Sequence, residues 1–207
     1  FFDVLEVLQA HTGAVVAQLP ASFGAAGVTL LDDFLAGLPH GWRYAVEVRD
    51  PRFFDGSTDH RRLDAVLLRH GCERVVLDSR TLYAAPPSSV AERQIWGRKP
   101  RLAVVPEPLT DRPIVRFIGR DDAETTAAGW AEWVDRAADW LREGRTPTVF
   151  VHTPDNTEAL PLARRFHDDV ARLVPGLQPL PVPLRHEAQA ARPAMQRRPW
   201  QPGRRRR

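Results

Sequence analysis

The sequence predicts an α/β protein built on a parallel sheet. Two observations favour this class: short apolar runs rich in β-branched residues recur along the chain, and amphipathic helical patterns lie between them. Strands that alternate with helices indicate βαβ units, and right-handed crossovers then place the helices outside the sheet. The predicted strands are 14–19, 44–49, 74–79, 113–119 and 148–153.

Four segments carry apolar residues at intervals of three and four, which line one face of a helix. In the longest, Trp130, Trp133 and Trp140 share a stripe, so we expect these tryptophans to pack in the core. The connection 82–108 is rich in proline and serine instead, and long connections in compact domains are often functional or disordered. The predicted helices are 28–38, 60–69, 126–143 and 158–174.

Composition indicates one globular domain followed by a tail. The 207 residues are 43% hydrophobic and 27% charged, enough for a single core. We expect a domain over 1–177 and a disordered basic tail over 178–207, which carries much of the net charge of +3. No apolar run reaches the roughly 18 residues of a membrane span, so no membrane association is expected. The single cysteine, Cys72, fits a reducing cytoplasm.

Alternation within the strands predicts a polar cluster. Each strand has one apolar face, and the other bears a polar side chain near its carboxyl end. In 74–79 we assign Val75 and Leu77 to the apolar face, and Val76 and Asp78 to the polar one. In a closed barrel the polar face points inward at the carboxyl-terminal mouth. The cluster is Gln18, Glu47, Arg49, Asp78, Arg116 and His152, with Ser79, Arg80, Arg120 and Asp155 on the loops above.

The residue types in this cluster suit binding of an anion and proton transfer. Guanidinium groups bind carboxylate and phosphate, and a histidine with carboxylates can act as general acid or base. Asp155 is expected to orient His152, and the charges nearly to cancel, because unpaired buried charge is costly. A salt-bridge network that merely fills the barrel throat is the alternative. The catalytic candidates are Glu47, Asp78, His152 and Asp155, and the substrate-binding candidates are Gln18, Arg49, Arg80, Arg116 and Arg120.

Motifs for metals and cofactors are missing from the sequence. It contains no HExxH, no histidine pair at ligand spacing and no cysteine cluster, and arginines beside the carboxylates would repel a divalent cation. Neither GxGxxG nor GxxxxGK[ST] occurs, and the GxSxG elbow is missing. We therefore expect neither a metal nor a cofactor.

Six motifs occur along the chain in a fixed order: QLPASFG (18–24), YAVEVRDPRFF (44–54), VVLDSR (75–80), RKPR (98–101), RPIVRFIG (112–119) and VFVHTPDN (149–156). Taken together in this order, they look like the YecE-like proteins (domain of unknown function, number 72), over essentially all of 1–177. The resemblance implies a TIM-like (β/α)8 barrel in which the strands here are the fourth to the eighth, with the first three βα units, roughly 80 residues, lacking. Asp50 departs from the family, whose members often carry histidine there.

Three functions stay open at this point, because the family has no established activity. The barrel is similar to the endonuclease IV and xylose isomerase type, which implies sugar-phosphate or nucleic-acid chemistry only by analogy. The first function is an enzyme that binds a phosphorylated or other anionic substrate at the barrel mouth. The second is a non-catalytic nucleic-acid-binding module that uses Arg98, Lys99, Arg101 and the tail, with Trp96 to stack on a base. The third is an inactive truncated fragment with open sheet edges. The oligomeric state is not predicted.

Overall fold

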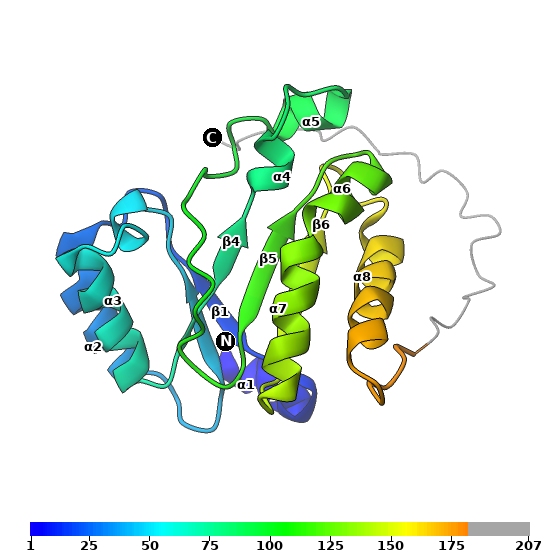
Figure 1. Ribbon diagram of the computed structural model, residues 1–207. Helices are drawn as coiled ribbons and strands as arrows, with labels where there is room; N and C mark the ends of the chain where they lie inside the picture. The colour runs from blue at the N-terminus through cyan, green and yellow to red at the C-terminus, as the bar shows by residue number, and fades with distance from the viewer. Residues whose placement is uncertain (182–207) are drawn as a thin grey trace, which may run out of the picture.

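A computed structural model describes residues 1–181, so all of the predicted tail 178–207 except its first four residues lies outside the described residues. All strands run in parallel, and helices lie outside the sheet (Figure 1), so the predicted α/β class is confirmed. The predicted strand 74–79 is divided into two short ones. The strands are β1 (Val15–Gln18), β2 (Tyr44–Glu47), β3 (Glu73–Arg74), β4 (Val76–Asp78), β5 (Ile114–Ile118) and β6 (Thr148–His152).

The run from β3 to β4 joins two three-stranded sheets, ordered β1-β2-β3 and β4-β5-β6. β3 pairs with β2, and β4 pairs with β5. Val75, between them, still donates its backbone N–H to Val46 O at 2.9 Å. Within the described residues β1 and β6 do not pair with each other, so no closed barrel forms there.

Two groups of helices cover the outer side of the strands. α2 and α3 lie against β1 to β3, and α6, α7 and α8 lie against β4 to β6 (Figure 1). No helix within 1–181 is long and apolar enough to cross a bilayer. The helices are α1 (Phe2–Leu5), α2 (Val28–Ala36), α3 (Thr58–Arg69), α4 (Arg80–Tyr83), α5 (Val90–Ile95), α6 (Ala123–Gly129), α7 (Ala131–Arg142) and α8 (Ala159–Leu173), with 3-10 turns at Glu6–His11, Ala25–Gly27 and Pro51–Phe53.

The predicted helix 126–143 is interrupted at Trp130. α6 ends at Gly129, and α7 begins after Trp130, whose ψ of 5° leaves the helical range. Gly129 lies against the side chain of Thr81, where a Cβ would have no room. The break thus brings α6 close to α4, while Trp130, Trp133 and Trp140 are all buried in the core, as expected.

The long connection replaces a crossover helix. After α4 and α5 it runs as an extended segment along the outer side of the strands, between α3 and α7, to the start of β5 (Figure 1). Leu102, Val105 and Leu109 pack in the α2–α3 cluster, and Val104 packs in the α7–α8 cluster. The segment therefore fills the space between the two helical groups, and both of its ends are fixed relative to the sheet.

Candidate anion-binding site

The strands have an outer and an inner face, and the packing of their side chains distinguishes the two. Val46 packs with α2 and α3 on the outer face, whereas Ala45, Val75 and Ile114 form a small cluster on the opposite, inner face. Parallel neighbours in register point the same way, and residues two apart share a face. The inner-face polar residues near the carboxyl ends of the strands are Gln18, Glu47, Arg116 and His152.

Glu47 is the centre of the inner-face cluster. Its carboxylate is fully buried: Oε1 accepts from Arg49 Nε at 3.1 Å and Nη2 at 2.9 Å, and Oε2 accepts from Arg116 Nη1. The same Arg116 nitrogen lies 3.1 Å from Gln18 Oε1. Both arginine side chains stay about one fifth exposed, at 22% and 21%. The structure thus brings Glu47, Arg49, Arg116 and Gln18 together, and both arginine side chains remain partly exposed.

His152 extends the cluster along β6. Its Nε2 lies 3.5 Å from Arg116 Nε, a long hydrogen bond in which the imidazole accepts. Burial, and then the charge of Arg116, lowers the pKa of His152, while a hydrogen bond with the Asn156 side chain opposes them. The neutral imidazole is thus favoured at pH 7, and it can take up a proton. The expected role of Asp155 as the group that orients His152 is corrected, since Asp155 accepts from Thr157 N at 2.8 Å instead and Asn156 contacts the ring.

The charge of Lys99, on the long connection, influences the same cluster, although the sequence prediction assigned this residue to nucleic-acid binding. Burial lowers the pKa of Lys99, followed by the charges of Arg116 and Arg49, and Glu47 opposes this effect. In turn, the Lys99 charge lowers the pKa of His152. The ammonium therefore lies within electrostatic reach of the whole site. Among the described residues no carboxylate forms an ion pair with it.

The expected inward orientation of Asp78 is wrong. β4 is in register with β5 so that Val76 and Asp78 share the outer face, and Val75 and Leu77 point inward. The buried Asp78 carboxylate accepts from Trp133 Nε1 at 2.7 Å and from Arg80 Nε at 3.0 Å. These donors outweigh the effect of burial, so the pKa of Asp78 is lowered. Asp78 thus joins the strand to α7 and takes no part in the inner site.

Arg80 also lies away from the inner cluster. Its guanidinium pairs with Asp78 and with Glu132 of α7, both within 2.9 Å. Asp50, the departure from the family pattern, pairs with Arg52 at 2.6 Å. Its charge is therefore balanced on its own loop and not by Arg49.

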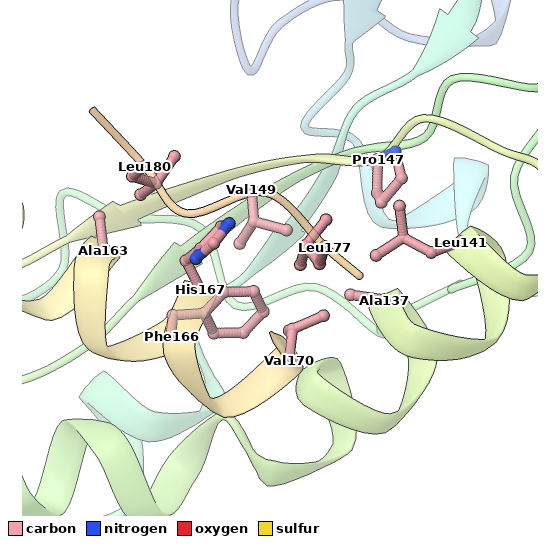
Figure 2. Close-up of a pocket in the computed structure, with 10 residues that line it drawn as sticks. All are labelled: Ala137, Leu141, Pro147, Val149, Ala163, Phe166, His167, Val170, Leu177 and Leu180. Atoms are coloured by element: carbon pink, nitrogen blue, oxygen red, sulfur yellow. The ribbon is translucent and has the colours of Figure 1, made fainter. Parts of the chain in front are cut away.

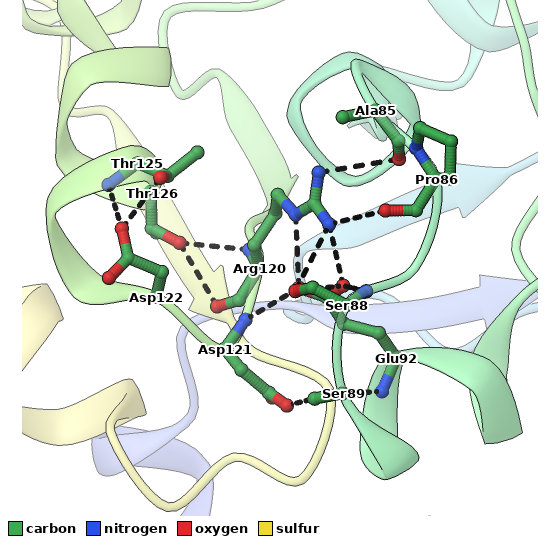
Figure 3. A network of polar contacts seen from close by, with 10 residues as sticks. All are labelled: Ala85, Pro86, Ser88, Ser89, Glu92, Arg120, Asp121, Asp122, Thr125 and Thr126. Atoms are coloured by element: carbon green, nitrogen blue, oxygen red, sulfur yellow. Dashed lines mark hydrogen bonds and ion pairs between the residues drawn. The ribbon is translucent and has the colours of Figure 1, made fainter.

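Arg120 is buried in a network of its own (Figure 3) and is not free to bind a substrate. It donates to Glu92 through Nε at 3.0 Å and through Nη2 at 2.7 Å. The carbonyl oxygen of Ala85 accepts from Nη1 at 3.3 Å, and that of Pro86 accepts from Nη2 at 2.8 Å. Glu92 is fully buried, and its hydrogen bonds with Arg120 above all lower its pKa to about 2. This network fixes α5 to the loop after β5.

The loop that carries Lys99 is held in place by hydrogen bonds from α4 and its N-cap. Ser79 Oγ donates to Pro100 O at 2.7 Å, and Tyr83 Oη donates to Lys99 O at 2.7 Å. The Arg101 guanidinium lies 3.9 Å above the Tyr83 ring and also faces Trp96. Arg101 therefore already covers the aromatic surface on which a nucleotide base would have to stack, and Arg98 is left exposed.

The inner site carries a small excess of positive charge. Glu47 is its one buried carboxylate, and it accepts hydrogen bonds from Arg49 and Arg116. With His152 neutral, these paired groups leave a surplus of one positive charge. Such an arrangement favours binding of an anion, because the fixed cations lie in a partly buried environment where screening is reduced.

One cavity among the described residues lies on the opposite, outer side of the strands. An apolar cavity of about 250 Å³ lies on the outer side of β6 between α7 and α8, where Phe166, His167 and Val149 line it and Leu177 and Leu180 cover it (Figure 2). Within 1–181, no group of three or more histidine, cysteine or acidic side chains is arranged to hold a metal ion.

The fold and the site define a parallel α/β protein with a cationic cluster at the carboxyl ends of its strands. The chain belongs to the family described as "Protein of unknown function DUF72", whose model matches residues 1–185. It is 34% identical over 181 residues to the UPF0759 protein YecE of Escherichia coli K12, and the YecE protein of E. coli O157:H7 matches equally well. The match covers 87% of this chain but 66% of the relative's length.

Solved structures resemble the fold at low sequence identity. A DUF72 family protein from Enterococcus faecalis V583 aligns over 84% of this chain and 66% of its own, with a TM-score of 0.55 and 14% identity. A second crystal structure of the same E. faecalis protein aligns with a TM-score of 0.52 and 15% identity. These matches support the parallel α/β fold alone.

Proposed function

We propose that the protein binds a small phosphorylated or otherwise anionic substrate at the carboxyl ends of its strands. Arg49 and Arg116 would hold the anion, and Glu47 positions both arginines. The observation that carries this proposal is the sharing of one buried carboxylate by two arginines that each remain partly exposed. The Glu47 carboxylate accepts hydrogen bonds from both arginines, so Glu47 is a positioning residue in this proposal.

Proton transfer, if the site catalyses a reaction, falls to His152. A neutral imidazole beside the anion-binding arginines can accept a proton from a bound substrate and return it later in the reaction. Asp78 and Asp155 are not available for this role, since the first lies on the outer face and the second caps its own loop.

We further infer that the strands belong to a TIM-like barrel. The side chains of Val16 and Phe150, on the inner faces of the two edge strands, are 40% and 45% exposed. Such apolar exposure is what additional parallel strands between β6 and β1 would cover. A cytoplasmic location remains our proposal on the basis of Cys72, which is free and buried.

Calorimetric titration of the 207-residue chain with sulfate tests the anion site. We expect saturable binding that Arg116→Gln weakens at least tenfold, as for the loss of a charge-assisted hydrogen bond. Arg93→Gln removes the same charge from the exposed surface of α5 and should leave binding unchanged. The proposal fails if sulfate does not bind, or if both variants weaken binding equally.

Nucleic-acid binding is the competing function, through Arg98, Lys99, Arg101 and the tail. Its affinity for an oligonucleotide would fall steeply with salt and would be insensitive to Arg116→Gln. That pair of results would favour this function over a small-anion site.

A further inference from the structure

The hydrogen bonds around Glu47 leave a defined set of donors free at the inner site, and this step rests on the proposed anion-binding function. A guanidinium has five N–H groups, one on Nε and two on each Nη nitrogen. Arg49 donates to Glu47 Oε1 through Nε at 3.1 Å and through Nη2 at 2.9 Å. Within 1–181 no group accepts from Nη1. Both hydrogens of Nη1 and the second hydrogen of Nη2 therefore form a free fork at the end of the Arg49 guanidinium.

Arg116 is engaged by more partners than Arg49. Its Nη1 donates to Glu47 Oε2 and lies 3.1 Å from Gln18 Oε1, which accepts its second hydrogen. Its Nε makes the long contact with His152 Nε2 at 3.5 Å. Only Nη2 has no acceptor among the residues that the structure describes. Because Arg49 and Arg116 bind the two oxygens of one carboxylate, their guanidinium groups are held next to each other.

Gln18 supplies a third free donor group. Its Oε1 must be the atom that faces Arg116, because a guanidinium can only donate, and its Nε2 then keeps two hydrogens that no described residue accepts. Gln18 is exposed at the end of β1 and pairs in register with Glu47 on β2, so the amide lies beside the carboxylate. The free donors thus come from three separate places: β1, β5 and the residue that follows β2 by two positions.

We propose that the anionic group of the ligand is tetrahedral, a phosphoryl or sulfuryl group, and that Gln18, Arg49 and Arg116 each donate to a different oxygen. A carboxylate has two oxygens in one plane, which the free fork of Arg49 satisfies by itself. The oxygens of a tetrahedral group point in different directions and can accept from donors on separate strands. Gln18 is therefore the residue that distinguishes a tetrahedral anion from a planar one.

Methanesulfonate and acetate are a matched pair of probes, since both are methyl-bearing monoanions at pH 8 but only methanesulfonate is tetrahedral. In NMR titrations of the 207-residue chain we expect methanesulfonate to bind at least about tenfold more tightly, as for the gain of a hydrogen bond to a charged group. Acetate that binds equally well or better would overturn the assignment but leave the anion site intact. If neither probe binds and sulfate does not bind either, the proposed function fails too.

A variant of Gln18 tests its part in this selection. Gln18→Met keeps the length of the side chain but removes the amide, so methanesulfonate and sulfate should bind about tenfold more weakly. Acetate should bind as it does to the wild-type chain. Gln94→Met makes the same replacement at an exposed position of α5 and should leave all affinities unchanged. If Gln18→Met affects all three anions equally, or none of them, Gln18 is not the selecting residue and the inference fails.

Methyl phosphate and methyl sulfate separate the two kinds of tetrahedral group. Each presents three free oxygens beside one methyl ester, so binding of either supports the assignment, and the tighter ligand identifies a phosphoryl or a sulfuryl substrate. Acetate that binds more tightly than both esters contradicts it.

Discussion

The network around Glu92 and Arg120 makes a quantitative prediction about stability. Glu92→Gln removes the charge from a carboxylate that is fully buried and that accepts from Arg120 Nε and Nη2, from Ser88 N at 2.7 Å and from Asp121 N at 3.2 Å. The difference between an ordinary pKa of 4.5 and about 2 in the folded protein corresponds to about 3 kcal/mol. Loss of one partner from a buried ion pair costs roughly 3–5 kcal/mol, which agrees.

The pH dependence has a definite sign. The pKa of Glu92 is depressed in the folded state, so its contribution to stability is complete above about pH 4.5 and is lost as the pH falls toward 2. The difference between the wild-type protein and Glu92→Gln should therefore be full at pH 7 and shrink below pH 4.5. Urea unfolding followed by tryptophan fluorescence measures it at each pH.

A surface ion pair provides the control for this experiment. Glu132 bonds Arg80 at 2.9 Å with about half of each side chain exposed, so Glu132→Gln should cost less than about 1 kcal/mol. If Glu92→Gln also costs less than 1 kcal/mol at pH 7, the buried pair does not stabilise the protein as argued. Hydrogen exchange of α5 would then reveal whether this segment opens without global unfolding.

Three further predictions concern individual contacts. His152 should titrate by NMR with a midpoint below 6.5, because burial and Arg116 lower its pKa, and Arg116→Gln should raise that midpoint; an unchanged midpoint would contradict the contact. Trp133→Phe removes the indole donor from a buried carboxylate and should lower the free energy of unfolding by about 1–3 kcal/mol in urea titrations, and a neutral result would refute the role of that bond. Gly119→Ala places a Cβ against the side chain of Thr126, 2.6 Å from its Oγ1. Chemical denaturation should therefore show a decrease of about 1–3 kcal/mol in the free energy of unfolding. Unchanged stability would mean that the loop after β5 moves to make room for the added methyl group.

Local patterns in the sequence were sufficient to predict most of the fold. Apolar periodicity located every strand and the long helices, because burial of one face dictates the spacing along each element. The interruption at Trp130 could not be predicted this way, since the apolar stripe continues on both sides of it. Its cause is the approach of Gly129 to Thr81, a contact between segments distant in the sequence.

The sequence prediction assigned Lys99 to nucleic-acid binding because its neighbours in the sequence are basic. The sequence RKPR indicates a basic loop, and nothing local reveals that its side chains diverge. Arg101 lies over Tyr83, whereas the charges of Arg116 and Arg49 in the inner cluster act on the pKa of Lys99. Hydrogen bonds from Ser79 and Tyr83 determine this division, and they connect residues 16 to 21 positions apart.

The two carboxylates at strand ends show how far alternation can specify a site. Glu47 and Asp78 are each followed two residues later by an arginine that pairs with them, yet the first points to the inner face and the second to the outer. Alternation fixes which residues share a face, but it does not say which face is inward when both sets contain apolar residues. For Asp78 the outer face is favourable because Trp133 supplies an indole N–H there. For Glu47 the inner face is favourable because Arg116 arrives from β5. In both strands a donor distant in the sequence satisfies the buried charge, and so decides whether the carboxylate supports the fold or organises the site.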